Sequence, residues 1–422
     1  MLGPGPAVVG PRRGLPDRPA PSSEAFAAAY EPLTGSADSD TTARSHSRLT
    51  YRGVMRRSWR WAVSACVVAV LVALPFVVRY APVLVQGSGP DAPAVLARMQ
   101  ASWSRPYAGY AESTGSLALP STDQLFDVST LLSSRTQVRV WWRSAADWRS
   151  DVISAAGETS TRTFAAAVST WDYEDNRVVV SPPEVPGSVR LPTATDTLPP
   201  QLAARMLGAA TAAEVTSVPA RRVAGRPAVG VRFQPADRLT SIGHVDAWAD
   251  EASGIPVLVE VFARTGETAA MSSTFLDFTD AIPTDADLAF APPQGARVQA
   301  GQRYDLVRDV VRSAAARPPV TLLGFERATP ARGLETIGEY GRGVTQIAVS
   351  ALPERLAEPL RDQLVLAASA TRVPQGVAVT VGPVGLLLSD AGAGGQSWLV
   401  AGTLTQEGLV QAAAALGSVT AS

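Results

Sequence analysis

The sequence predicts a mainly β protein of the α+β class, with one large antiparallel sheet, a few helices to one side of it and a small α/β domain at the C-terminus. Three observations support this prediction. Between residues 107 and 280, short stretches in which apolar residues recur at every second position alternate with turn residues. A helical period returns near residue 301. A run of 18 uncharged residues, from 61 to 78, precedes both regions and predicts a single transmembrane helix.

The uncharged run reads WAVSACVVAVLVALPFVV. As a helix it would span roughly 27 Å, close to the hydrocarbon thickness of about 30 Å. Residues 1–22 are rich in proline and glycine, and the stretch that follows lacks periodicity. The sequence therefore predicts a disordered tail (1–57), a transmembrane helix (58–82) and a linker (83–91).

The orientation of the predicted helix follows from its flanking charges. Six arginines lie between Arg44 and Arg60 with no acid among them, whereas Arg79 alone follows the run at once. The positive-inside bias places the N-terminus in the cytoplasm and the main domains outside the cell membrane. A cleaved signal peptide is the alternative, although the long leader and the lack of a clear A-x-A site favour retention.

After the linker, the sequence predicts a helix and then ten strands. In the helix, Val95, Leu96, Met99 and Trp103 share one face. A second, short helix at 198–210 has Leu202, Met206 and Leu207 on one side, and 121–133 is a further interruption. The predicted strands are 107–119, 136–144, 147–154, 159–175, 177–182, 214–225, 227–235, 242–250, 255–264 and 269–280.

A second domain is predicted over 301–422, separate from the sheet domain at 92–300. An amphipathic helix at 304–317 is followed by strands at 320–328, 343–352, 377–390 and 397–404. The last helix begins after Thr405, the N-cap candidate, and contains Gly408 inside it. The glycine-rich stretch 391–395 lies between strands, so a hairpin loop is favoured over a phosphate-binding loop.

The composition excludes several classes of function. The chain has no lysine, which rules out a Walker-type phosphate loop and a Schiff-base lysine. It has two histidines, His46 and His244, and no G-x-S-x-G, H-E-x-x-H or Cys-x-x-Cys motif. A net charge of -1 argues against nucleic-acid binding. We expect no enzyme, no cofactor and no metal, and with Cys66 alone the outer part folds without disulfides.

Residues 245–261, VDAWADEASGIPVLVEV, contain three acids around a tryptophan. We interpret Asp250, Glu251 and Gly254 as the turn of a hairpin, with these charges solvated at a rim. Asp246 shares a strand face with His244, but two side chains at i and i+2 do not make a metal or acid/base site.

Two other charged segments also favour turns. In DYEDN at 172–176 the calcium-loop interpretation fails at Arg177, where glycine is required, and Asp175-Asn176 suit a hairpin turn. The arginines at 221, 222 and 226 flank a turn at Gly225, where a solvated loop is favoured over contact with anionic headgroups.

Several strands are apolar on both faces, so one face of the sheet must pack against something other than water. The candidates are the helices, a second sheet layer or a ligand. Burial of an acyl chain is worth about 0.8 kcal/mol per methylene, which makes a lipid a plausible occupant on packing grounds. For the strand tryptophans Trp142, Trp148, Trp171 and Trp248, plain core is favoured over cavity lining. The predicted cavity residues are Val138, Val140, Trp142, Trp171, Trp248, Val257, Val259, Val261 and Phe275.

The segments APAVLARMQASW, YAGYAESTGSL, TWDYEDNRVVV and VDAWADEASGIPVLVEVF, in this order, resemble the LolA/LppX/RseB-like superfamily, particularly actinobacterial forms related to lipoprotein carriers or sigma-E regulators. The composition, rich in Ala, Val, Gly and Arg, suits a GC-rich genome. The C-terminal WLVAGTLTQEGLVQAAAAL is similar to the small domain of RseB-type sensors. The resemblance implies an antiparallel half-barrel, lidded by helices over an apolar cavity for lipid or acyl chains.

Two functions remain open at this stage. The first is a membrane-anchored, extracytoplasmic protein that binds a lipid or an acylated lipoprotein. The second is an RseB-like envelope-stress sensor that pairs with a membrane regulator such as an anti-sigma factor, or with a transporter. The predicted anchor departs from the soluble carriers of the superfamily and puts free shuttling in doubt.

Overall fold

The computed structural model describes residues 91–116, 133–154, 157–164, 167–183, 192–292, 294–301, 314, 316–330, 333–392 and 395–418. The predicted tail, transmembrane helix and nearly all of the linker lie outside the described residues, as do Cys66, His46 and most of the helix predicted at 304–317. Within the described part of the chain, no helix combines the length and apolar character needed to cross a membrane.

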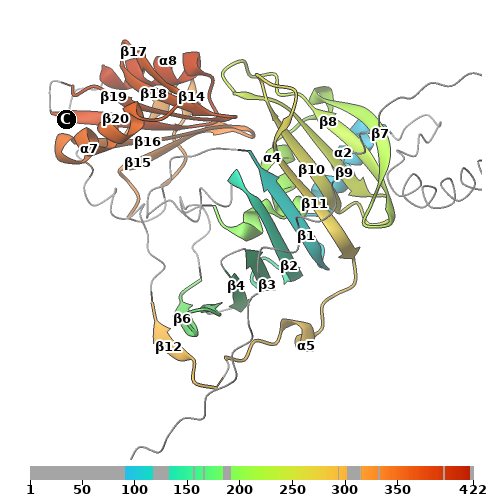
Figure 1. Ribbon diagram of the computed structural model, residues 1–422. Coiled ribbons are helices and arrows are strands. Elements are labelled where there is room, and N and C mark those ends of the chain that lie inside the picture. The colour runs from blue at the N-terminus through green and yellow to red at the C-terminus, as the bar shows by residue number, and fades with distance from the viewer. Residues whose placement is uncertain are drawn as a thin grey trace, which may run out of the picture. The chain divides into compact units, whose positions relative to one another are not determined.

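The first sheet has twelve strands, and all but one of its neighbouring pairs are antiparallel (Figure 1). The order is β12-β6-β5-β4-β3-β2-β1-β11-β10-β9-β8-β7, so the sheet is not closed into a barrel. The strands are β1 (Tyr107–Gly115), β2 (Arg135–Ser144), β3 (Asp147–Ser154), β4 (Gly157–Phe164), β5 (Ala167–Asp172), β6 (Arg177–Ser181), β7 (Val215–Val223), β8 (Arg226–Phe233), β9 (Ile242–Asp250), β10 (Pro256–Ala263), β11 (Ala269–Thr279) and β12 (Arg297–Ala300). This arrangement confirms the predicted large antiparallel sheet.

Turn chemistry explains where the chain reverses. Asn176, between β5 and β6, has φ 44°, and Gly225, between β7 and β8, has φ 74°. Gly254 has φ 74° in the turn between β9 and β10. Asparagine and glycine tolerate this left-handed region better than other residues, so the three predicted hairpins are confirmed.

One predicted strand is wrong in its extent. The stretch 159–175 is not a single strand but the hairpin of β4 and β5, which pair from Thr159 with Asp172 to Phe164 with Ala167. Three consecutive alanines at 165–167 carry no turn signal of the glycine or proline kind, which is why the sequence pattern missed the reversal.

The helices of this domain pack on one face of the sheet, here called the inner face, which carries Val138, Val140 and Trp142. The elements are α2 (Ala92–Ala101), the 3-10 turns η1 (Ala194–Thr197) and η2 (Ala212–Glu214), and α4 (Pro199–Leu207). The predicted apolar stripe of α2 is buried at Val95, Leu96 and Met99, and that of α4 at Leu202 and Leu207. These side chains form one core with the apolar residues of β8, β9 and β10.

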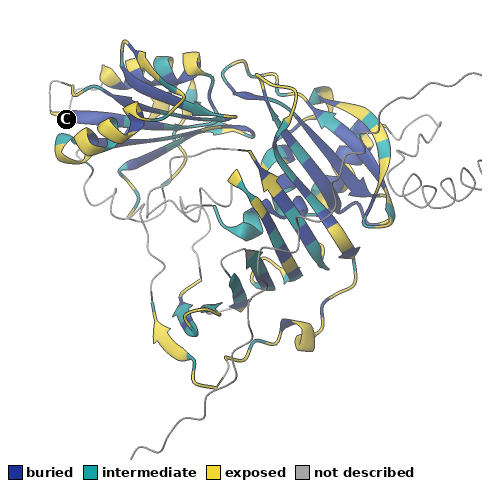
Figure 2. Cartoon of the chain, viewed as in Figure 1, coloured by how far each residue is buried: buried dark blue, intermediate teal, exposed yellow. Residues whose placement is uncertain are grey.

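A short segment connects the sheet domain to the rest of the chain on the opposite, outer face. It contains the one-turn helix α5 (Asp285–Leu288) and ends in β12. β12 is the single parallel strand and lies beside β6 at the edge of the sheet. All four of its residues are exposed (Figure 2).

A second sheet, formed by the C-terminal part of the chain, has six strands in the order β15-β16-β20-β19-β18-β17. Helix α8 (Gln406–Gly417) packs on one face, and Thr405 accepts a hydrogen bond from Gly408 N at 3.1 Å, as the N-cap prediction requires. Helix α7 (Glu354–Val365) packs on the other face. The strands are β15 (Ile337–Arg342), β16 (Thr345–Pro353), β17 (Ala370–Val373), β18 (Gly376–Val381), β19 (Val384–Ser389) and β20 (Gln396–Gly402). A two-residue hairpin, β13 (Thr321–Leu322) and β14 (Phe325–Glu326), precedes them where one strand was predicted.

The sequence pattern did not predict α7. Pro359 lies inside this helix, and only Ala357 and Leu364 are buried. An internal proline normally ends a helix and two buried residues make a weak stripe, so neither the breaker nor the period signal pointed to helix here.

Candidate functional site

Seven of the nine predicted cavity residues lie together on the inner face. Ala111 of β1 is the register partner of both Phe275 on β11 and Val138 on β2, which aligns these three strands. Alternation along the strands then places Val140, Trp142, Val257, Val259 and Val261 on the same side. All seven are buried, with exposed fractions from 0% to 8%. The face is therefore apolar and filled in this structure.

The other two predicted residues, Trp171 and Trp248, lie on the outer face. Trp248 pairs with Leu258, and its indole N–H donates to Pro219 O at 2.9 Å. The guanidinium of Arg221 covers its ring at 3.9 Å from the ring centroid. Trp171 stacks on Tyr173 with a centroid distance of 3.6 Å. Trp171 does not belong to the core cluster of the inner-face residues, whereas Trp248, although on the outer face, belongs to the same cluster as Tyr107 and Phe275.

Tyr107, which the sequence analysis did not name, and Trp148, one of the strand tryptophans, complete the inner face. Tyr107 stacks on Trp142 at 6.0 Å between ring centroids, and Trp142 stacks on Trp148 at 5.7 Å. Phe275 meets Tyr107 edge-on at 5.8 Å, and its ring lies where a Cβ on Gly109 would be. The pairing register brings these rings together from four strands, and period-two patterning alone carries no information about register.

A short stretch of chain covers the centre of this aromatic group. Leu198, 1% exposed, packs with Tyr107, Val140 and Trp142, and Ala194 of η1 packs against the same cluster. Gln201 Nε2 lies 3.4 Å from the Tyr107 hydroxyl oxygen. Burial raises the pKa of Tyr107 far above its ordinary value, and the bond to Gln201 offsets this only in part. We call η1, Leu198 and the first turn of α4 the cover segment.

The inner face becomes more polar towards β5. Ser150 pairs with Thr161, and Thr161 pairs with Thr170, so hydroxyls from β3, β4 and β5 form one row across the sheet. The same row continues to Val140 on β2. One end of the inner face is thus aromatic and aliphatic, and the other presents hydroxyls, which suits an amphiphilic occupant.

The acids of the β9–β10 hairpin are structural. Asp250, 1% exposed, accepts from Arg226 Nε at 2.7 Å and Nη2 at 3.0 Å. Asp246, 5% exposed, accepts from Arg232 Nε and Nη2, both at 2.7 Å. The prediction that these charges are solvated at a rim is wrong for both residues, because each is buried in a two-bond ion pair with an arginine of β8.

His244 does not join these carboxylates in a metal site. Its ring stacks on Phe262 at 4.2 Å, and burial together with the nearby charge of Arg232 lowers its pKa. No group of three or more metal-binding side chains occurs among the described residues.

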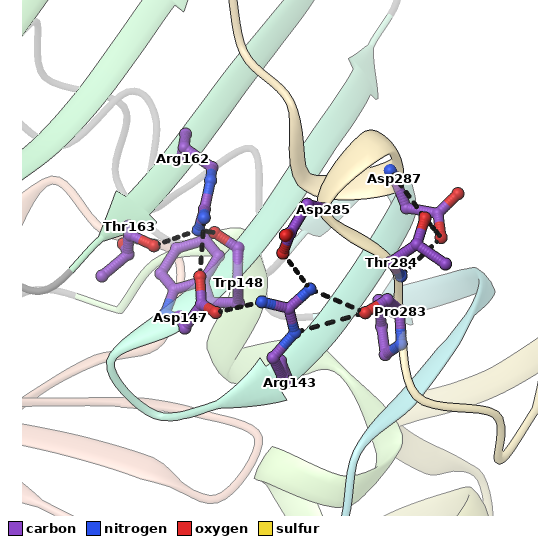
Figure 3. A network of polar contacts seen from close by, with 9 residues as sticks. All are labelled: Arg143, Asp147, Trp148, Arg162, Thr163, Pro283, Thr284, Asp285 and Asp287. Atoms are coloured by element: carbon purple, nitrogen blue, oxygen red, sulfur yellow. Dashed lines mark hydrogen bonds and ion pairs between the residues drawn. The ribbon is translucent and has the colours of Figure 1, made fainter.

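A pocket of about 440 Å³ lies on the outer face, beside the segment that carries α5. Arg143 donates to Pro283 O at 2.8 Å and to Asp285 at 2.8 Å, and also bonds Asp147 at 3.0 Å (Figure 3). Arg162 pairs with the other oxygen of Asp147 at 2.6 Å. The guanidinium groups of Arg143 and Arg162 are each paired with a carboxylate. We therefore interpret this pocket as the place where the connecting segment attaches to the sheet.

Comparison with known proteins gives matches among solved structures only. No family model matches the sequence, and no curated protein matches it. A chain of the Pseudomonas aeruginosa MucA/MucB complex is similar in structure, with a TM-score of 0.42 and 16% identity over 76% of this chain and 97% of that one.

Two further solved structures match the chain over about half its length. A LolA superfamily protein from Nitrosomonas europaea has a TM-score of 0.21 and 10% identity, covering 47% of this chain and 98% of that one. A putative outer membrane lipoprotein-sorting protein domain from Vibrio parahaemolyticus has a TM-score of 0.20 and 11% identity, covering 47% and 95%. The structural neighbours are MucB and LolA-superfamily proteins.

Proposed function

We propose that this protein is a membrane-anchored, extracytoplasmic binding protein that holds a lipid, or the acyl part of a lipoprotein, on the inner face of its large sheet. The proposal assigns it no catalytic step. Among the described residues, the buried carboxylates Asp246 and Asp250 of the large sheet are each held in an ion pair with an arginine.

The observation that carries the proposal is the aromatic and aliphatic inner face beneath a cover segment of one 3-10 turn and one helical turn. Exposing Leu198 by moving this cover costs about 1.5–3 kcal/mol in lost burial. An acyl chain of about sixteen carbons offers on the order of 12 kcal/mol in gross terms, before ordering costs. This gross gain exceeds the loss from Leu198 alone, and the buried Pro199 and Pro200 of the same segment add to the cost of moving the cover.

The proposal is tested by photo-crosslinking of the full chain with palmitate that carries a diazirine on its chain. We expect labelled residues to alternate along β2 and β11, on Val138, Val140 and Phe275, and to spare the outer-face neighbours Arg139 and Trp141. The two faces of one strand act as matched controls for each other. Labelling of both faces alike, or no labelling above a sample with excess unlabelled palmitate, would overturn the proposal.

A second candidate function, pairing with a membrane regulator such as an anti-sigma factor, is favoured by one observation. The edge strand β12 is fully exposed, and its outer side is open to an extended segment of another protein. The MucB structure was solved in complex with MucA. Capture of membrane proteins by the anchored chain, lost when Val298 becomes proline, would support this candidate, and capture unchanged by V298P would argue against β12 as its surface.

A further inference from the structure

Two serine hydroxyls are buried without a partner in the middle of the inner face. Ser113 of β1 and Ser273 of β11 are direct register partners. They are 3% and 0% exposed, and neither Oγ forms a hydrogen bond. Buried hydroxyls nearly always have a partner, so two adjacent exceptions require an explanation.

The pair has no charged acceptor beside it, and the neighbouring acceptors are the neutral hydroxyl of Thr136 and the two serine oxygens themselves. Ser273 lies beside Val259 on β10, and Ser113 lies beside Thr136 on β2. Along their own strands, the nearest residues on the same face are Ala111, Gly115, Met271 and Phe275. These neighbours are aliphatic, aromatic or a neutral hydroxyl, and none of them is charged.

The energetics favour an external partner. A buried hydroxyl without a hydrogen bond loses its solvation and gains nothing in return. Alanine would fill either position without this cost, because it lacks only the oxygen. A pair of donors that face the same apolar space is explained by an acceptor that arrives with a ligand.

We infer that Ser113 and Ser273 bind the carbonyl oxygens of the ester or amide groups that join acyl chains to the head of the ligand. This inference rests on the proposed function and extends it to a named chemical class. A carbonyl is a neutral acceptor, which matches a site with two neutral donors and no adjacent cation. The acyl chains then lie along the apolar rows that continue to Val138 and Phe275, and the head lies away from them.

The pair of ligands that tests this inference differs only in the carbonyls. Dipalmitoylglycerol has two ester carbonyls, and its dihexadecyl ether analogue has the same chain lengths and none. Displacement of a fluorescent fatty acid from the full wild-type chain gives both affinities. We expect the ester to bind about tenfold more tightly than the ether.

Substitutions then assign the preference to the two serines. In the double variant Ser113→Ala/Ser273→Ala, we expect the ester and the ether to bind within about twofold of each other, and the ether to bind about as tightly as to the wild type. Ser272→Ala is the matched control, because it removes a hydroxyl from the same strand on the outer face and should keep the full preference.

The outcomes separate the two ideas. Failure of the fluorescent fatty acid to bind the wild type would overturn the proposed function and this inference with it, whereas a bound probe that neither ligand displaces would overturn this inference alone. Equal binding of ester and ether to the wild type would leave lipid binding intact and overturn the carbonyl site, since ordered water would then be the partner. An ester preference that survives the double variant would also overturn it.

Discussion

Replacement of Asp250 by asparagine should destabilise the hairpin of β8 and β9 by about 2–3 kcal/mol. The carboxylate accepts two bonds from Arg226 and two more from Ser253, at 2.8 Å from its N–H and 2.7 Å from its hydroxyl. Charge-assisted bonds contribute about 1.5–3 kcal/mol each when one partner is removed. The full sum is not expected, because the side chain of Arg226 is 30% exposed and recovers hydration, and the amide retains one acceptor.

A neighbouring acid provides the control for this change. Asp280 lies 3.4 Å from Arg226 Nη1 and is 34% exposed. Its replacement by asparagine should change stability by less than about 0.5 kcal/mol, as is usual for an exposed pair. Native-state hydrogen exchange of the β8 and β9 amides measures both variants locally, without assuming that a multidomain chain unfolds in one step.

The same residue predicts a pH dependence. Burial alone would raise the pKa of Asp250, but the hydrogen bonds from Arg226 and Ser253 outweigh it and hold the pKa below its ordinary value. The stabilisation is therefore complete above the unfolded pKa of about 3.9 and is lost as the pH falls through the lower folded value. Protection of β8 and β9 should drop in that acid range in the wild type and change little in Asp250→Asn. Equal effects of the two substitutions, or the same acid response in both proteins, would refute this account.

Three further outcomes are expected. Arg143→Ala removes the contacts to Pro283 and Asp285, so the amides of residues 283–289 should exchange faster while those of β10 are unchanged; equal rates would contradict the attachment. Gly230→Ala places a Cβ 2.4 Å from the Trp248 indole nitrogen. It should lower the free energy of unfolding by about 1–3 kcal/mol, measured by urea unfolding followed by tryptophan fluorescence. An unchanged urea midpoint would show that the outer face can relax. Burial raises the pKa of Tyr340 to about 12. Its neutral form therefore stabilises the fold up to about pH 10, and this contribution is lost as the pH rises towards 12. A late step in the ultraviolet titration should disappear in Tyr340→Phe, and persistence of the step would assign it to another tyrosine.

The fold was largely predictable because strand formation is encoded locally. Alternation and turn residues located nearly every strand of the large sheet, and the helical stripe of α2 marked Val95 and Met99 as buried before any contact was known. Failures occurred where the local signal was absent or contradictory, at the reversal between β4 and β5 and at Pro359 inside α7.

The candidate site was only partly predictable. The sequence of a single strand shows which residues share a face, but the register between strands depends on residues far apart in the chain. A strand pattern shows that Asp246 and Trp248 share a side, but it does not say whether that side matches the one that carries Val138. The β-bulge between Tyr110 and Ala111 shifts the pairing with β11 and adds to this uncertainty. Long-range alignment of this kind produces both the ion pair of Arg226 with Asp250 and the pairing of Ser113 with Ser273. No sequence pattern could predict them.

The position of β1 beside β11 governs how the molecule can fold. Ser116 N donates to Ala270 O across this junction, between residues that are 154 positions apart in the chain. Strands β2 to β6 can extend from β1 as consecutive hairpins, and β10 to β7 can form a second meander that ends at β11, since each contact there is local. Joining the two meanders requires closure of a long loop, which makes it the slow step. Until synthesis passes residue 279, the edge of β1 has no partner strand, and Ser113 and Ser273 face each other only after the two meanders join.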